Sequence, residues 1–344
     1  MKAVILVGGE GTRLRPISLM MPKPVVPVAN VPLIFYIFEW LIKHGVDEAI
    51  MVACYLPDLL KKVIGETYKG MKVTYIYEEA PLGTGGAIKR AQKMMKGTTL
   101  VINGDVVTDF DITKMYKFHK EKKSRATIGL YLVKNYSAFG VVETTKEGEI
   151  KRFLEKPSKE ELGLEAAEIN AGVYLLEPEV LDIMQEGVKY SIERDVFPKL
   201  TGKSFYGFAQ NDIYWLDLGT SDKLRKFTKD VLEERYVLKL HSPGYVVKGA
   251  GSKVAKNSVT GTGVKLGTST EIGELTVIGN NVSIGNQTSI NNSIVFDNVK
   301  IGSGCVIENA IICSGSIIGD NSVIEDNSII APDSRVAAFT KLKS

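Results

Sequence analysis

From residue 245 to its end, the chain repeats an aliphatic side chain every six positions, and this period restricts the fold more than any other feature of the 344 residues. Two steps of eleven residues interrupt the period. Gly often follows the aliphatic residue, as in Ile278-Gly279 and Ile301-Gly302. The repeated positions are Val254, Thr260, Leu266, Ile272, Ile278, Ile284, Ile290, then Ile301 and Ile307, then Ile318, Ile324, Ile330 and Val336.

A period this short predicts a triangular β-solenoid, in which each unit makes one side and turns its aliphatic residue inward. Gly and Asn suit the corners, where the backbone needs positive φ. Only Phe296 and Phe339 are aromatic after Tyr245, as a narrow core requires. The pattern resembles the left-handed parallel β-helix of hexapeptide-repeat proteins. The left hand is implied by this resemblance, because ordinary crossovers are right-handed. We expect this domain to span residues 245–344.

Residues 1–240 alternate strand-like and helix-like segments. Strands are predicted at 4–7, 49–54, 72–77 and 99–103, and helices at 32–43, ended by Gly45, and at 58–65. This order predicts an α/β domain with a Rossmann-like, mixed and mostly parallel sheet covered by helices on both faces. We place the linker between the domains at residues 241–244, His-Ser-Pro-Gly.

Charge and composition exclude several classes of function. The net charge is only +3, from 43 Lys and Arg against 40 Asp and Glu, so we expect no nucleic-acid partner. No apolar run reaches the roughly 18–20 residues that span a bilayer, so we expect no membrane partner. A strand begins at once with no signal peptide ahead of it, and Cys54, Cys305 and Cys313 lack metal-ligand spacing. We therefore expect a cytoplasmic protein with reduced cysteines.

A glycine-rich loop follows the first predicted strand. Gly8-Gly9-Glu10-Gly11-Thr12-Arg13 lets backbone N–H groups approach a phosphate closely, and Arg13 adds a bidentate cation. The loop lacks the Gly-Lys-Ser/Thr of a Walker A motif, and Leu14 occupies the third glycine of a dinucleotide fingerprint. By itself, it also fits a glycine-rich turn with an incidental arginine. Lys23 follows between two prolines, which restrict where its ammonium points.

Together the loop and Pro22-Lys23-Pro24 closely resemble the signature of the sugar nucleotidylyltransferases, and the resemblance continues through the whole first domain. Further segments fall in the family's order. They are residues 81–87 (its nucleobase loop), Asn103-Gly104-Asp105 (its first metal-binding carboxylate), residues 153–157 and 169–174 (its sugar-phosphate segments) and residues 215–220 (its second metal-binding carboxylate).

The resemblance implies a role for each matched residue. The expected catalytic residues are Arg13, Lys23, Asp105 and Asp217, and the two aspartates are the expected ligands of Mg²⁺. The expected nucleotide contacts are Leu6, Gly8, Gly9, Gly11, Thr12, Arg13, Lys23, Gly83, Thr84, Gly85, Asn103 and Gly104. The expected sugar-phosphate contacts are Gly140, Glu155, Lys156, Asn170 and Gly172.

The implied reaction joins a nucleoside triphosphate to a hexose-1-phosphate and releases pyrophosphate. The attacking phosphate oxygen is already anionic, so no general base is needed, and positioning and charge stabilisation carry the catalysis. Mg²⁺ prefers few protein carboxylates and several phosphate or water oxygens. A carboxylate that ends a buried strand, as Asp105 does, is costly unless a metal or donor satisfies it. A turn or helix-cap aspartate is the alternative there.

Neighbouring residues lead to simpler predictions. Asp109 and Asp111 are expected to cap a helix that begins near residue 113. His44 and His119 each lie near the end of a predicted helix and are expected at the surface. Besides these, the chain holds one histidine, His241.

Within the family, the opening segment, the nucleobase loop and the hexapeptide tail look most like mannose-1-phosphate guanylyltransferases. The expected substrates are therefore GTP and mannose-1-phosphate. Thymidylyl- and uridylyltransferases acting on glucose-1-phosphate are the alternative, although they usually carry a base-reading Gln and none occurs between Tyr77 and Ala91.

Two other classes remain open. Hexapeptide-repeat acyltransferases use a histidine in the solenoid, and no histidine follows His241, so we expect the tail to serve structure and homo-oligomer contacts. Non-catalytic regulatory subunits share both domains but tend to lose the metal carboxylates or phosphate lysines. Arg13, Lys23, Asp105, Lys156 and Asp217 are all present, which favours an enzyme.

Overall fold

A computed structural model describes residues 1–236 and 244–343, which form two compact units. The first contains residues 1–10 and 37–217. The second contains residues 11–36 and the described residues from 218 onward. Residues 241–243 of the predicted linker lie outside the described residues, and the predicted domain boundary between 240 and 245 stays a prediction.

A ten-stranded mixed sheet forms the centre of the first unit. Its middle strands run parallel in the order β7-β1-β4-β6, with bounds β1 Lys2–Leu6, β4 Glu48–Ala53, β6 Met71–Tyr77 and β7 Thr99–Asn103. All four strands predicted from hydrophobic runs are confirmed to within two residues. Consecutive residues such as Val4 and Ile5 are both fully buried, which shows that both faces of the sheet are covered.

Beyond β7 the sheet continues with mostly antiparallel strands. β12 (Ala167–Leu176) pairs with β10 (Gly140–Thr144) near its start and with β7 near its end, while β9 (Ala126–Val133) runs along its other side. A bulge between Asn170 and Tyr174 marks the change of neighbour. The remaining strands are β5 Thr67–Tyr68, β11 Ile150–Glu155 and β13 Phe205–Ala209. The predicted mixed, mostly parallel α/β class is confirmed.

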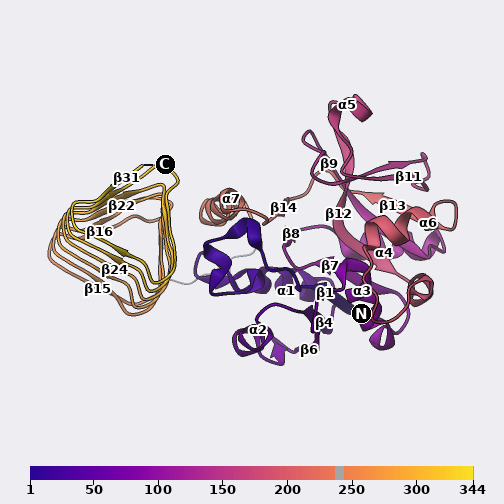
Figure 1. The fold of residues 1–344 in the computed structure, drawn as a ribbon, viewed down its shortest axis with the longest axis horizontal. Helices are drawn as coiled ribbons and strands as arrows, with labels where there is room; N and C mark the ends of the chain where they lie inside the picture. The colour runs from indigo at the N-terminus through magenta and orange to yellow at the C-terminus, as the bar shows by residue number, and fades with distance from the viewer. Residues whose placement is uncertain (237–243, 344) are drawn as a thin grey trace. The chain divides into compact units, whose positions relative to one another are not determined.

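The predicted helices are present as α1 (Leu33–Lys43) and α2 (Pro57–Ile64). Figure 1 shows α3 and α4 against the sheet of the first unit. The other α-helices are α3 Gly83–Ala91, α4 Ile112–Glu121, α5 Lys159–Leu162, α6 Phe197–Leu200 and α7 Ser221–Leu232. One segment is π-helical, η6 (Ile192–Val196). The described 3₁₀ turns are η1 Thr12–Leu14, η2 Ile17–Leu19, η3 Lys23–Val25, η4 Gln92–Met94 and η5 Pro178–Ile183. None of the helices in residues 1–236 and 244–343 combines the length and hydrophobicity needed to cross a membrane.

Helix α4 corrects two predictions. Asp111 caps it by accepting the N–H of Lys114, as expected, but Asp109 instead accepts the backbone N–H of Tyr214 at 2.7 Å. His119 is not at the surface. It is fully buried because it follows the buried Ile112 and Met115 at helical spacing, and its ring bonds Thr127 and Glu177.

The predicted solenoid is present as three parallel sheets, visible in Figure 1 as stacked triangular coils. Each strand pairs with the strand one coil later, as in Ile272↔Ile290 and Ile284↔Ile301. The strands are β15 Val246–Lys248, β16 Lys253–Val254, β17 Val259–Thr260, β18 Val264–Leu266, β19 Glu271–Ile272, β20 Val277–Ile278, β21 Ser283–Ile284, β22 Ser289–Asn291, β23 Ile294–Val295, β24 Lys300–Ile301, β25 Val306–Glu308, β26 Ile311–Ile312, β27 Ile317–Ile318, β28 Val323–Ile324, β29 Ile329–Ile330, β30 Arg335–Val336 and β31 Lys341–Leu342.

The two steps of eleven residues also have an explanation. Val295 and Ile312 occupy the missing inward positions in β23 and β26, and both are fully buried in the core of the coil. They come only five residues after Ile290 and Ile307, so one side of each of these coils is one residue shorter. A strict six-residue period therefore does not identify Val295 and Ile312 as inward positions.

Candidate active site

The glycine turn continues directly from β1 at the carboxyl end of the parallel strands. Val7 still donates its N–H to Val52 of β4 at 3.0 Å, so the turn begins at Gly8. Gly9 is exposed, with no atom within 4 Å of the position a Cβ would take. The turn thus leaves open space beside its backbone, which a phosphate group requires.

The segment after β7 packs against the end of β1. Gly104 donates its N–H to Leu6 O at 2.9 Å, and a Cβ on Gly104 would lie 2.5 Å from Val7 Cγ1 and 2.8 Å from Leu6 O. Only glycine fits at that distance. This close approach brings Asp105 beside the start of the glycine turn.

Replacing Gly104 with alanine is expected to lower the free energy of unfolding by about 1–3 kcal/mol, because the added methyl group overlaps backbone and a buried side chain. Urea denaturation of the purified variant measures the change. An unchanged denaturation midpoint would show that β1 and β7 separate easily at this point.

A second sheet, of two strands, brings Asp217 close to Asp105. β14 (Trp215–Asp217) pairs antiparallel with β8 (Val106–Thr108), and Asp217 is the register partner of Val106, the residue after Asp105. Opposed Cα atoms in such pairs lie roughly 4.5–5.5 Å apart. The indole Nε1 of Trp215 donates to Ala171 O at 2.9 Å, which ties β14 to the bulge in β12. The pairing brings the two predicted carboxylates to one place.

This donor set fits a magnesium ion. Mg²⁺ keeps several water or phosphate oxygens and takes only one or two carboxylates from the protein. Residues 1–236 and 244–343 contain no group of three or more His, Cys, Asp or Glu side chains placed to hold a metal. Asp105 and Asp217 are two carboxylates, which is the number that a nucleotide-bound Mg²⁺ takes from a protein. Their role as its ligands stays a prediction.

Two predicted sugar contacts face each other across β10 and β11. Gly140 is the register partner of Glu155, and a Cβ on Gly140 would lie 3.1 Å from Glu155 Oε2. Burial raises the pKa of Glu155, and the nearby charge of Glu193 raises it further, while Lys156 and Arg194 lower it. Lys156 is exposed, with its ammonium 3.8 Å from Glu155, so it is accessible to a phosphate.

The other sugar residues lie in the bulge of β12. Gly172 has φ +73° and donates its N–H to the side chain of Asn170, which in turn donates to the Tyr174 hydroxyl. A Cβ on Gly172 would lie 2.8 Å from the amide nitrogen of Asn103. The bulge therefore touches the segment that carries Asp105, and bulges often re-aim side chains at active sites.

The predicted nucleobase loop begins α3 and is bonded to the segment before η6. The N–H groups of Gly85 and Gly86 both donate to Tyr190 O, and Gly85 is buried. The Thr84 hydroxyl donates to Glu193 and accepts from the Ile192 N–H. These groups hold the loop in place, and the nucleotide contacts of Gly83, Thr84 and Gly85 stay predictions.

The remaining predicted nucleotide residues belong to the second unit. Gly11 has φ +64°, and its carbonyl accepts from the Ser18 hydroxyl and the Leu14 N–H. Thr12 and Arg13 in η1 are exposed. Lys23 opens η3, and the position of a Cβ on Gly11 lies 3.7 Å from Lys23 Cβ. The convergence of these residues with Asp105 and Asp217 stays a prediction.

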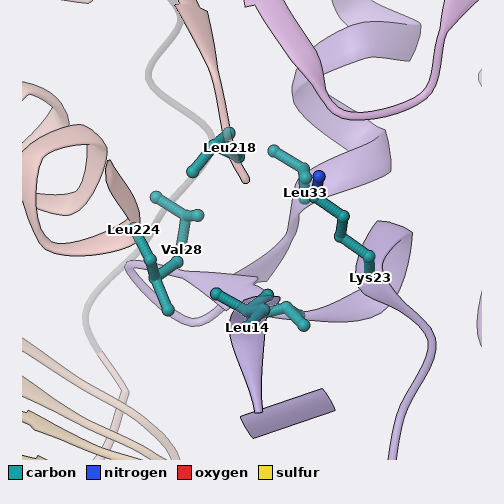
Figure 2. Close-up of a pocket in the computed structure, with 7 residues that line it drawn as sticks. Leu14, Lys23, Val28, Leu33, Leu218 and Leu224 are labelled. Atoms are coloured by element: carbon teal, nitrogen blue, oxygen red, sulfur yellow. The ribbon is translucent and has the colours of Figure 1, made fainter. Parts of the chain in front are cut away.

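Lys23 also borders a small apolar pocket. Figure 2 shows its aliphatic stem extending past Leu33, with Leu14, Val28 and Leu224 on the other sides. The empty volume is about 200 Å³, smaller than most small-molecule sites. We interpret it as a gap in the core of the second unit that buries the lysine stem and leaves the ammonium at its edge.

The sequence prediction missed Glu78, which follows β6. Its side chain is 7% exposed, its Oε2 lies 3.2 Å from a Cβ position on Gly8, and its Oε1 has no hydrogen-bond partner among the described residues. Burial raises the pKa of Glu78, against the lowering effects of the Leu82 N–H and the Arg90 charge. An acid at the carboxyl end of a parallel strand is the same signal that identified Asp105. It went unused because no family motif contained it.

Comparison with known families agrees with this geometry. The profile of the family described as "Nucleotidyl transferase" matches residues 2–234, and that described as "EIF2B subunit epsilon LbH domain" matches residues 240–342. The second match agrees with the three parallel sheets and bears out the predicted left-handed β-helix.

Relatives carry out related reactions. A mannose-1-phosphate guanylyltransferase of Mycobacterium tuberculosis is 35% identical over 235 residues, 67% of this chain and 64% of the relative, so the match spans just under two thirds of that relative's length. A UTP–glucose-1-phosphate uridylyltransferase of Synechocystis is 33% identical over 276 residues, 75% of this chain and 70% of the relative.

A solved structure has the same fold over the first part of the chain. It is HddC from Yersinia pseudotuberculosis complexed with GMP-PN, 30% identical, with a TM-score of 0.58 over 67% of this chain and 98% of that one. The family profile covers residues 2–234, which is well over half of the chain. The chain therefore belongs to the nucleotidyl transferase family.

Proposed function

We propose that this protein is a Mg²⁺-dependent sugar-1-phosphate nucleotidylyltransferase that converts GTP and mannose-1-phosphate to GDP-mannose and pyrophosphate. One observation carries the proposal. The β8–β14 pairing sets Asp217 beside Asp105, and Gly104 holds this pair against the glycine turn after β1. A carboxylate pair beside a phosphate-binding turn suits a reaction between two phosphates.

In this reaction an oxygen of the sugar phosphate forms a bond to the α-phosphorus of the nucleotide. The bond from that phosphorus to the bridging oxygen breaks, and pyrophosphate leaves with the electron pair. A bound Mg²⁺ would neutralise charge on the phosphate oxygens. We assign Asp105 and Asp217 to hold it, Arg13 and the glycine-turn N–H groups to bind the triphosphate, and Lys23 to stabilise charge at the reacting phosphate.

The residues predicted to bind the sugar phosphate are assigned roles from their charge and exposure. Lys156 would bind the sugar's phosphate, since it is exposed and charged beside Glu155. Glu155 would accept hydrogen bonds from sugar hydroxyls, together with Asn170 and the backbone of Gly140 and Gly172. Mannose and glucose differ at one stereocentre, so our choice of mannose rests on the relatives with matching motifs rather than on a single contact.

Glu78 supports guanine as the base. A buried carboxylate with an unused oxygen accepts two parallel donors, and guanine offers N1–H and the exocyclic amine side by side. Uracil and thymine offer one N–H between two carbonyl oxygens, which a carboxylate repels. The missing side chain of Gly8 lets the glycine turn pass close to Glu78, since a Cβ there would lie 3.2 Å from Glu78 Oε2.

We further propose a cytoplasmic enzyme that forms homo-oligomers through the β-helix. The structure has no disulfide among its described residues, and Cys305 and Cys313 are buried in the coils, as suits a reducing compartment. Phe339, in the last described coils, exposes a large aromatic side chain, which favours contact with a second copy.

A pyrophosphate-release assay with Mg²⁺ tests the proposal. Each of GTP, ATP, UTP and dTTP is paired with mannose-1-phosphate and with glucose-1-phosphate, and the highest kcat/KM is expected for GTP with mannose-1-phosphate. A preference for UTP or dTTP would overturn the assignment of the base. No product from any pair would favour a regulatory subunit of the same fold.

A further inference from the structure

Glu193 connects the two substrate sides of the first unit. It lies on η6, and one of its oxygens, Oε2, accepts from the hydroxyls of Thr84 and Ser191, both at 2.7 Å. Thr84 belongs to the nucleobase loop. The same loop is bonded to this segment through Gly85 N–H to Tyr190 O, Tyr190 N–H to Leu82 O and Ile192 N–H to Thr84 Oγ1.

The sugar side of Glu193 is defined by Glu155 and Tyr174. The charge of Glu193 acts on both groups, and Tyr174 is fully buried and bonded to Asn170. Both hydroxyls that donate to Glu193 use the same oxygen, Oε2. One oxygen of Glu193 is thus bonded to the base loop, while η6 packs against β11, the strand that ends in Glu155.

The local backbone fits a functional position. η6 is a π-helical segment, a rare form that occurs mostly at functional sites. Ser191 caps it by accepting from the Arg194 N–H and donates its own N–H to Asp195. The Ser191 hydroxyl donates to the same oxygen of Glu193 as the Thr84 hydroxyl, so the direction of this carboxylate depends on both bonds.

We infer that Glu193 is a positioning residue that couples the base loop to the sugar pocket, so that binding of each substrate favours binding of the other. The inference rests on the proposed function. Nucleotide contacts that tighten the base loop would also fix Thr84 and hence Glu193. A fixed Glu193 would hold the pocket around Glu155 in the form that accepts the sugar.

Two substitutions separate the effect of the Thr84–Glu193 hydrogen bond from the effect of the Glu193 charge. Thr84→Val removes the hydroxyl at nearly constant volume and breaks the connection from the loop side. Glu193→Gln keeps an acceptor oxygen for Thr84 but removes the charge that faces Glu155. The matched control is Glu186→Gln, since Glu186 lies in the loop before η6, is exposed and forms its salt bridge with Lys93.

The primary measurement is GTP binding with and without mannose-1-phosphate, together with kcat and both KM values. In the wild type, the sugar phosphate is expected to tighten GTP binding several-fold, and Thr84→Val is expected to abolish this coupling and raise both KM values roughly tenfold. Glu186→Gln is expected to behave as wild type. A rise confined to the KM for GTP, with the coupling intact, would overturn the inference.

The pH profile gives a second readout. The charged groups that face Glu155 are Glu193, Lys156 and Arg194, and burial is the larger cause of its raised pKa. Removing the Glu193 charge lowers that pKa, so Glu193→Gln is expected to move the acid limb of kcat/KM for the sugar phosphate to lower pH. An unmoved limb would contradict the inference. Failure of the proposed function is a separate result, namely absence of product from the wild type.

Discussion

Replacing Asp105 with asparagine is expected to lower kcat by about 10³-fold or more while the protein stays folded. Asp105 lies in the turn between β7 and β8, beside Asp217, and an ion-bound phosphate at that point is worth several kcal/mol of transition-state stabilisation. Asn keeps the shape but loses the charge. The measurement is pyrophosphate release at saturating substrates over a series of Mg²⁺ concentrations.

Asp217→Asn provides the second arm of this test. If both aspartates hold one ion, the double variant is expected to be little worse than either single variant, because the second substitution removes a ligand already without function. Asp58→Asn is the control, since Asp58 is exposed in the first turn of α2. Near-wild-type turnover of folded Asp105→Asn, or fully additive losses, would contradict a shared ion.

Replacing Glu78 with glutamine is expected to raise the KM for GTP by roughly 10–100-fold, because a buried charged hydrogen bond is lost. The KM for mannose-1-phosphate is expected to change little. The preference for GTP over UTP is expected to fall by a similar factor, since the amide no longer repels the carbonyl oxygens of uracil. Glu79→Gln is the control, as Glu79 is the exposed neighbour of Glu78. Unchanged selectivity would remove Glu78 from the base site.

The same substitution is expected to stabilise the fold near neutral pH. Burial raises the pKa of Glu78, so the folded chain holds its proton to higher pH than the unfolded chain. The free energy of unfolding therefore falls as the pH rises from the unfolded to the folded pKa, and the loss persists above it. Removing the titrating group should cancel this loss. The expected result is a higher Tm for Glu78→Gln than for the wild type at pH 7, with no difference at acid pH.

Much of the fold, and one of the two paired aspartates, could be predicted because the signals are local in sequence. The buried strands are continuous apolar runs, and the β-helix repeats one aliphatic residue per side. Asp105 was predicted because it follows such a run directly. Asp217 came only from the family motif, since nothing in the residues around it identifies its partner strand.

The misses have a common cause. His119 was predicted at the surface from its place near a helix end, whereas the face it occupies depends on what α4 packs against. The six-residue period did not identify Val295 and Ile312, because each follows the preceding inward residue by five positions. Both side chains still point into the core, since the side of the coil is only one residue shorter. In both cases the burial of the side chain depends on the residues that pack against it, which the local sequence does not specify.

The sequence by itself determined the class of each domain and the position of the glycine turn and of Asp105 after the first and fourth predicted strands, because periodicity and strand hydrophobicity are properties of short segments. The tertiary structure alone decided that Glu78 lies against Gly8, that Asp217 pairs beside Asp105, and that Thr84 meets Glu193. These pairs are separated by about 70 to 110 residues. Their contacts arise from strand order and register, which short segments do not specify.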